Sequence, residues 1–173
     1  MSAQGELRSL TVEDAEALER FLSEFDAHPS ELGGYFCRRD EQIEEVVRLI
    51  DGWEKEELLP AGWVPSSTRF WVIEGELAGV INVRHHLTPH LEEVGGHIGY
   101  SVAPSQRCKG VATAMLAGVL AHCRALGLTR ALLTCNAENI ASWKVIERCG
   151  GLLEREGWSE KEQRAQRWYW FTL

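Results

Sequence analysis

Apolar residues recur at helical spacing twice in the first third of the chain. After a short strand predicted at residues 7–10, the pattern Thr11-x-x-Asp14 resembles a capping box, an arrangement that begins many helices. The apolar positions that follow are Ala15, Leu18, Leu22 and Phe25, and those of the second segment are Ile43, Val46, Val47 and Ile50. Their spacing predicts two amphipathic helices, separated by a loop at residues 26–34 that contains proline and glycine.

The pattern becomes that of β-strands after Thr68. Residues 70–73 and 77–83 are rich in β-branched and aromatic side chains and are separated by Gly75, which predicts an antiparallel hairpin. Further along, the pattern predicts a strand at 97–102 that Pro104 ends and a helix at 109–126 that Gly127 ends. After these come a buried strand at 131–135, a helix from Asn139 to Gly150, and strands at 152–158 and 167–173.

This order of elements predicts an α/β (α+β) fold, in which a mixed central sheet of about seven strands is flanked by four helices. The chain has 173 residues, of which 45% are hydrophobic, so it can bury one core and is close to the usual size of one domain. No internal repeat divides it. We therefore expect a single domain over residues 1–173.

The charge balance and the cysteines limit the partners of the protein. A net charge of −8 opposes general affinity for nucleic acid or an anionic membrane and weakly favours cationic acceptors. The apolar runs are too short to span a bilayer, and the first residues do not resemble a signal peptide.

The cysteines are Cys37, Cys108, Cys123, Cys135 and Cys149, and the absence of C-x-x-C spacing predicts reduced thiols. We expect a cytoplasmic protein with no nucleic-acid or membrane partner.

The segment from Ile98 to Thr113 is the most informative part of the sequence, because a predicted strand leads there through a basic turn into a helix. The first N–H groups of a helix have no partner within it, and the helix dipole adds partial positive charge. Arg107 and Lys109 place full charges beside these groups, and Gly110 lets the backbone approach a ligand closely. The segment predicts a pyrophosphate site, with an ordinary basic helix cap as the alternative.

Two motifs in this half of the chain resemble those of the GNAT superfamily of acetyltransferases. Arg107-x-x-Gly110-x-Ala112 resembles the acetyl-CoA motif of the family, Q/R-x-x-G-x-G/A. Further along, Asn139-x-x-Ser142-x-x-Val145-Ile-Glu147-Arg148-x-Gly150 is similar to the next block of the family, N-x-x-A-x-x-L-Y-E-K-x-G. The resemblance extends over residues 6–173, and segments 84–91 and 95–100 are similar to a subgroup of predicted bacterial acetyltransferases.

The resemblance implies acetyl-CoA as the cofactor and assigns residues to it. Backbone groups of Val102 would pair with the pantetheine arm in a gap between the fourth and fifth strands, and Asn139 and Ser142 would contact the same arm. The pyrophosphate would be held by Arg107 together with the backbone amides of Cys108, Lys109, Gly110, Val111, Ala112 and Thr113. The chain departs from the family at Cys108, where glycine is common, and at Ile146, where many members carry a tyrosine that protonates the thiolate.

His97 stands where some members of the family place a glutamate base. Because imidazole titrates near neutral pH, one hypothesis is that His97 accepts the proton of the amine, and a hydrogen bond within the sheet is the alternative. The spacing of the four histidines at 85, 86, 90 and 97 matches no zinc pattern, so no metal is predicted. His85 and His86 are instead expected to contact the acceptor from a loop at 85–93, which Pro89 keeps from forming a helix. Trp53, Trp63 and Trp71 are candidates either for the acceptor pocket or for the core.

The predicted function is therefore acetyl-CoA-dependent transfer of an acetyl group to the primary amine of a small-molecule or peptide acceptor. The alternative is an acyl-CoA-binding sensor or interaction module without efficient transfer, which the absence of a tyrosine at Ile146 favours. The final aromatic segment at 168–171 predicts a half-buried strand, or else the edge at which a homodimer forms.

Overall fold

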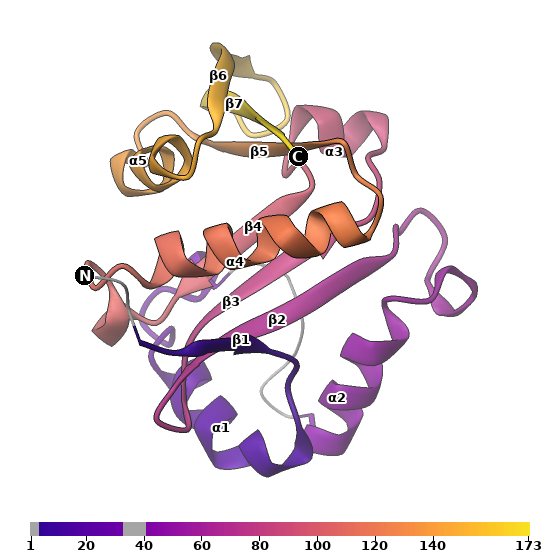
Figure 1. Ribbon diagram of the computed structural model, residues 1–173, viewed down its shortest axis with the longest axis vertical. Helices are drawn as coiled ribbons and strands as arrows, with labels where there is room; N and C mark the ends of the chain where they lie inside the picture. Colours follow the sequence, from indigo (N-terminus) through magenta and orange to yellow (C-terminus); the bar gives the residue numbers. More distant parts are fainter. Residues whose placement is uncertain (1–3, 33–40) are drawn as a thin grey trace.

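The computed structural model describes residues 4–32 and 41–173, so Cys37 lies outside the described residues. Within this part of the chain the strands form two antiparallel sheets (Figure 1). The larger sheet has the order β1-β2-β3-β4, formed by β1 (Glu6–Arg8), β2 (Ser66–Ile73), β3 (Glu76–Arg84) and β4 (Ile98–Val102). The smaller sheet has the order β5-β7-β6, formed by β5 (Arg130–Asn136), β6 (Leu152–Ser159) and β7 (Arg164–Thr172). The expected α/β fold of about seven strands with flanking helices is confirmed, and the strands divide into two antiparallel sheets where one mixed sheet was expected.

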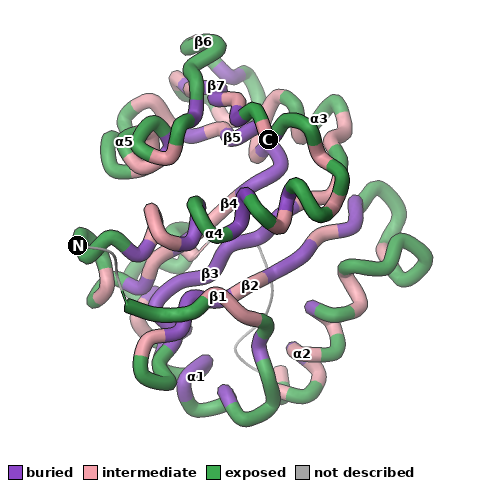
Figure 2. Tube along the Cα trace, viewed as in Figure 1, coloured by how far each residue is buried: buried purple, intermediate pink, exposed green. Residues whose placement is uncertain are grey.

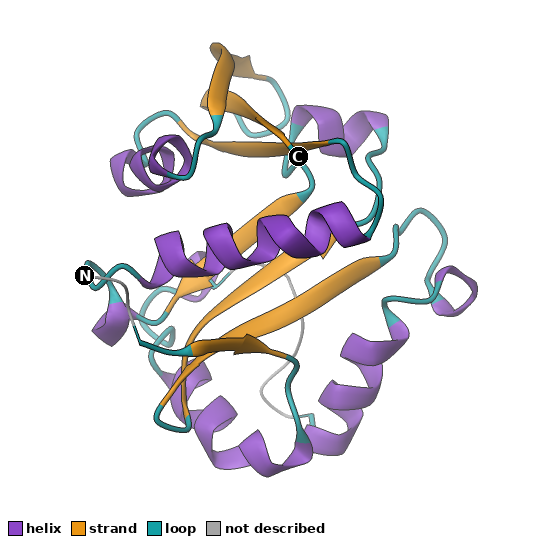
Figure 3. Cartoon of the chain, viewed as in Figure 1, coloured by secondary structure: helices purple, strands orange, loops and turns teal. Residues whose placement is uncertain are grey.

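Helices cover both faces of the larger sheet (Figure 3). α1 (Ala15–Ser23) and α2 (Ile43–Gly52) lie on one face, α4 (Val111–Ala125) lies on the other, and α5 (Ile140–Arg148) lies beside the smaller sheet. A fifth helix, α3 (Pro89–Glu93), forms where a loop was expected. Proline is favourable at the first helical position because its missing N–H needs no partner there, and the side chain of Thr88 caps the helix by accepting the N–H of Leu91 at 3.3 Å.

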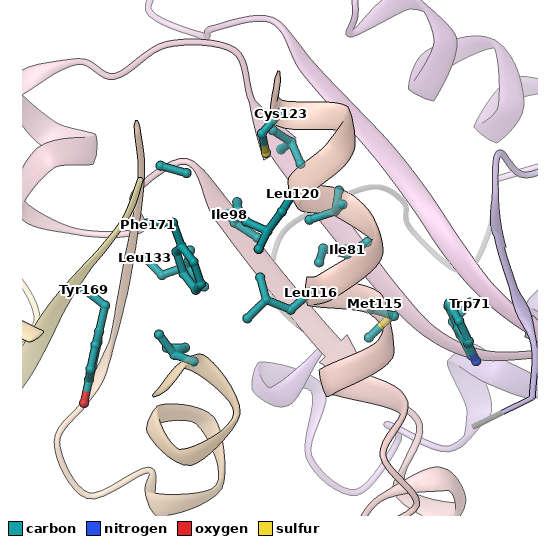
Figure 4. Close-up of a cluster of buried hydrophobic side chains, with 14 of the residues drawn as sticks. Trp71, Ile81, Ile98, Met115, Leu116, Leu120, Cys123, Leu133, Tyr169 and Phe171 are labelled. Carbon is teal, nitrogen blue, oxygen red and sulfur yellow. The ribbon is translucent and has the colours of Figure 1, made fainter. Parts of the chain in front are cut away.

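The main core joins the two sheets through α4 (Figure 4). Side chains of α4 point toward the larger sheet and are Met115, Leu116, Leu120 and Cys123. They pack there against Ile81 and Ile98. The smaller sheet completes the same cluster with Leu133, Tyr169 and Phe171. A second cluster lies between the opposite face of the larger sheet and helices α1 and α2, so the strands β2 and β3 are buried on both sides (Figure 2).

The two sheets meet over only three residues before β4. Gly96 forms an isolated bridge with Leu133, the His97 N–H donates to the Leu132 carbonyl at 2.7 Å, and the Gly95 N–H donates to the Thr134 hydroxyl at 2.9 Å. Gly96 has a φ of 63°, and a Cβ at this position would lie 2.4 Å from the Leu132 oxygen, so only glycine fits. Beyond this junction β4 and β5 separate.

The predicted capping box at the start of α1 is present and carries an ion pair. The Asp14 carboxylate accepts two hydrogen bonds from the Arg8 guanidinium, each of 2.7 Å, and also accepts the Thr11 N–H at 2.8 Å. The hydrogen bond with Arg8 is the main cause that lowers the pKa of Asp14 to about 2. This ion pair ties β1 to the helix that follows it.

The final aromatic segment does not form a sheet edge, because β7 pairs with β5 on one side and with β6 on the other. The exposed apolar side chains Leu152, Leu153 and Trp158 lie on β6, which is one of the two edge strands of this sheet. The idea that residues 168–171 form a dimer edge is therefore wrong for β7. None of the described helices is both long enough and apolar enough to cross a membrane.

Candidate active site

A recess of about 190 Å³ opens where β4 and β5 separate. Its walls come from β4 and the segment before it, from β5 and from α5 with its N-cap. They are formed by Gly95, Ile98, Gly99, Tyr100, Leu133, Thr134, Cys135, Asn136, Asn139, Ser142 and Ile146. Ligand pockets usually measure roughly 300 to 1,000 Å³, so this recess fits a narrow chain rather than a whole nucleotide.

A pair of hydroxyl groups lies in this recess. The Tyr100 hydroxyl and the Ser142 Oγ are 3.0 Å apart, and the Asn139 side chain accepts the Ser142 N–H at 3.1 Å, which fixes the first turn of α5. Ile146 is fully buried and brings no proton donor. Sequence reasoning did not select Tyr100, although the alternation of a strand places it on the same face of β4 as Val102.

The basic turn lies between the end of β4 and the start of α4. Gly110 occupies the N-cap position of α4 with a φ of 84°, and Cys108 also has a positive φ, of 60°. Within the described part of the chain the N–H groups of residues 108–113 have no protein acceptor, and the first helical hydrogen bond runs from the Ala114 N–H to the Gly110 carbonyl at 3.0 Å. The turn therefore presents a row of unpaired amides at the positive end of a helix of 15 residues.

Recess and turn lie at the two ends of β4. Tyr100 in β4 lines the recess, and at the exit of the strand Arg107 donates from Nε to the Val102 carbonyl at 3.4 Å. A ligand with a narrow arm and an anionic end would therefore lie along β4, with its anions at the amides of residues 108–113. Of the predicted cofactor residues, Asn139 and Ser142 line the recess, and Arg107 contacts Val102 at the exit of β4.

His97 does not have the position expected of a base. It is 6% exposed, and its Nδ1 accepts the Leu132 N–H at 2.9 Å, so the proton of the neutral ring is on Nε2. Burial, together with the charge of Arg84, lowers the pKa of His97 to about 4. Because its accepting nitrogen is already occupied and the ring is only weakly basic, the hypothesis that His97 accepts the proton of the amine does not fit the structure, whereas the alternative of a hydrogen bond between the sheets does.

The residues expected at the acceptor do not line the recess. His85 is half-buried with its Nε2 at 2.8 Å from the Ser67 hydroxyl, and His86 is exposed. Trp71 belongs to the main core. The ring centroids of Trp53 and Trp63 lie 6.0 Å apart, with Trp53 partly buried against the second core cluster and Trp63 exposed. Among the described residues no three histidine, cysteine or acidic side chains gather as they would around a metal ion.

A split between two sheets, with hydroxyl groups at one end and unpaired helix amides at the other, defines a class of protein that binds acyl thioesters of CoA. The family model of the acetyltransferase (GNAT) domain matches residues 6–151. The chain therefore belongs to the GNAT family and is an acyltransferase, and acetyl-CoA is the cofactor that this family uses.

Solved structures show the same fold. RimL, a ribosomal L7/L12 α-N-protein acetyltransferase in complex with coenzyme A, is 19% identical with a TM-score of 0.71, over 99% of this chain and 96% of that chain. A putative ribosomal-protein-serine acetyltransferase from Vibrio cholerae is 18% identical with a TM-score of 0.67, over 100% and 96%. An acetyltransferase from Salmonella typhimurium that modifies the N-terminal serine of L7/L12 is 19% identical with a TM-score of 0.69, over 99% and 96%. None of the curated proteins matches the chain.

Proposed function

We propose that the protein transfers an acetyl group from acetyl-CoA to a primary amine. The observation that carries this proposal is the continuity along β4 of the recess, the half-buried end of the strand at Val102 and the unpaired amides of residues 108–113. When bound, acetyl-CoA supplies an acetyl group activated as a thioester. This chain supplies the groups that hold both ends of that molecule.

Each end of the site has its own task. The amides of residues 108–113, with the charges of Arg107 and Lys109, bind the pyrophosphate, because unpaired N–H groups and the helix dipole both favour anions. Backbone groups of Val102 pair with the pantetheine arm, and Asn139 and Ser142 contact it from α5.

The hydroxyls of Tyr100 and Ser142 take the place of the missing tyrosine at Ile146 in this proposal. Either hydroxyl can turn its O–H toward the departing sulfur while the other donates the hydrogen bond between them, at 3.0 Å. A hydrogen bond to developing negative charge stabilises the transition state. With His97 bound to Leu132, the amine loses its proton to water, so the rate should rise with pH until the acceptor is deprotonated.

The acceptor in this proposal is a small-molecule or peptide amine. RimL and the Salmonella typhimurium protein act on the N-terminus of a ribosomal protein, which makes peptides with a free N-terminus the first class to test here. A net charge of −8 also favours cationic acceptors such as polyamines. Cytoplasmic location and a homodimer stay predictions.

Thermal unfolding with CoA, combined with consumption of acetyl-CoA in the presence of an amine panel, tests the proposal. At about 100 times its dissociation constant CoA should add roughly 2.7 kcal/mol to the free energy of unfolding. Arg107→Gln should reduce this gain and leave the unliganded protein almost unchanged, because Arg107 is exposed. Stabilisation without amine-dependent consumption of thioester would favour the sensor, and no stabilisation at millimolar CoA would refute the cofactor site.

Substitution of the hydroxyl pair tests the chemistry. Ser142→Ala should lower kcat by about 100-fold at most, which is the lower end of the range for lost acid catalysis, because a CoA thiolate leaves readily. Ser142→Thr, which keeps a hydroxyl, should retain most of the activity, and the loss in Ser142→Ala should be larger in kcat than in CoA affinity, because the amides of residues 108–113 still hold the pyrophosphate. Equal losses in the alanine and threonine variants would show that Ser142 acts through packing.

A further inference from the structure

Arg107 is already bound to an acidic side chain in the structure. Its Nη2 lies 2.6 Å from the Glu31 carboxylate, and its Nε reaches the Val102 carbonyl at 3.4 Å. The guanidinium therefore faces the exit of β4 and a carboxylate, although it stands next to the row of amides that the proposed function assigns to the pyrophosphate. Arginine binds phosphate best through two parallel N–H groups, and Glu31 occupies part of that fork.

The structure holds the Glu31 backbone in place. Glu31 ends the single-turn helix η2 (Pro29–Glu31), and the buried Ser101 hydroxyl in β4 lies 2.9 Å from the Glu31 carbonyl and 2.8 Å from that of Leu32. A second attachment joins the Glu24 carboxylate to Ser105, at 2.8 Å to its N–H and 2.9 Å to its hydroxyl. The segment after α1 is thus fastened to β4 and to the turn beyond it, so the carboxylate of Glu31 is presented to Arg107 from a fixed backbone.

We propose that Glu31 competes with the phosphates of CoA for Arg107 and thereby sets the affinity and the release rate of the cofactor. This inference rests on the proposed function, in which Arg107 accompanies the pyrophosphate. Both groups are anions that suit the same guanidinium, so phosphate binding has to displace or share the carboxylate. The hydrogen bond with Arg107 also lowers the pKa of Glu31, which keeps the competitor ionised at neutral pH.

The expected size of the effect follows from the exposure of the pair. The side chains of Arg107 and Glu31 are 44% and 42% exposed, so the contact is partly screened by solvent. Exposed ion pairs of this kind change an equilibrium by a factor of about 1.5 to 5. Removing the carboxylate also removes a negative charge beside the phosphates, so Glu31→Gln should tighten CoA binding by about threefold to tenfold. Most of this gain should appear as slower dissociation, since related complexes differ mainly in that rate.

Calorimetric titration with CoA tests the proposal in four proteins: the wild type, Glu31→Gln, Arg107→Gln and the double variant. The control is Glu24→Gln, which loosens the same segment from Ser105 and leaves the partner of Arg107 in place. The expected result is tighter binding in Glu31→Gln, unchanged binding in Glu24→Gln, and a clearly smaller effect of Glu31→Gln in the Arg107→Gln background, where only the repulsion between the carboxylate and the phosphates remains. Such coupling would not arise from a purely structural role.

The other outcomes distinguish a failure of this inference from a failure of the proposed function. Unchanged or weaker binding in Glu31→Gln, in a protein that binds CoA, would overturn the competition and leave the proposed function standing. The same gain in the presence and absence of Arg107 would also overturn it, because Glu31 would then act by repulsion alone. Failure of the wild type to bind CoA would remove the proposed function and this inference together.

Discussion

His97 offers the sharpest test of how the two sheets are joined. In His97→Ala the Leu132 N–H loses its acceptor at 2.9 Å in a buried place, and an unpaired buried N–H costs about 1 to 3 kcal/mol. The free energy of unfolding at pH 7.5 should therefore fall by about 2 kcal/mol. An exchange such as His90→Ala, at an exposed position on α3, is the matched control and should have little effect.

The pH dependence adds a second, independent signature. Burial lowers the pKa of His97 from 6.5 to about 4, so between these values the unfolded chain binds a proton that the folded protein does not. The stabilisation that neutral His97 provides is complete above pH 6.5 and is lost as the pH falls toward 4. Between pH 7.5 and 5 this linkage amounts to about 2 kcal/mol. The difference between wild type and His97→Ala should therefore shrink by about that amount on acidification.

Urea unfolding at several pH values measures both effects, and the turnover number at pH 8 completes the test. If His97 is structural, kcat of the folded variant should stay within a few-fold of the wild type. A loss of about 100-fold with unchanged stability would refute this reasoning and restore His97 as a base. A stability difference that is the same at every pH would refute the assignment of the low pKa to the folded protein.

Further predictions concern three local features. Asp14→Asn should lower the free energy of unfolding by about 2 kcal/mol at pH 7, because Arg8 holds the pKa of the carboxyl near 2, and the difference in urea midpoints should fade as the pH falls from 4 toward 2. Cys108→Gly should raise the melting temperature slightly and Cys108→Val should lower it. The reason is that a φ of 60° disfavours any side chain, and a β-branched side chain most. Equal melting temperatures of the two variants would contradict this. Gly96→Ala should cost about 2 kcal/mol or more, because its Cβ would meet the Leu132 oxygen, and a wild-type melting curve would show that the junction can shift.

Local chemistry made the backbone of the basic turn and of the α5 cap predictable from the sequence. The turn from Arg107 to Gly110 and the cap at Asn139 are short segments whose glycine, charge and capping residues fix the backbone directly. The four longer helices could be predicted from the spacing of their apolar residues, which is also a local property of the sequence. The fifth was missed because Pro89 was interpreted as a helix breaker, whereas proline at the first position of a helix is favourable.

Long-range pairing explains what the sequence did not predict. Periodicity identifies a strand but not its neighbour, so neither the division into two sheets nor the central place of β7 could be predicted from the chain. The partners of His97 and Arg107 are Leu132 and Glu31, which lie far away in sequence, and nothing near either residue indicates them. The role proposed for the Tyr100 hydroxyl likewise depends on its contact with Ser142, which lies on a later helix.

The division of the strands follows the order of the chain, and this has a consequence for how the protein is made. β1 to β4 end at Val102 and β5 to β7 begin at Arg130, with α4 between them. Each sheet is therefore complete within one continuous stretch of polypeptide, so the first can form on the ribosome before the second has been synthesised. α4 then offers the emerging smaller sheet an apolar surface on which to assemble. The recess between β4 and β5 is complete only when this last step joins the two parts, so with the proposed function nascent chains gain the capacity to bind CoA late in translation.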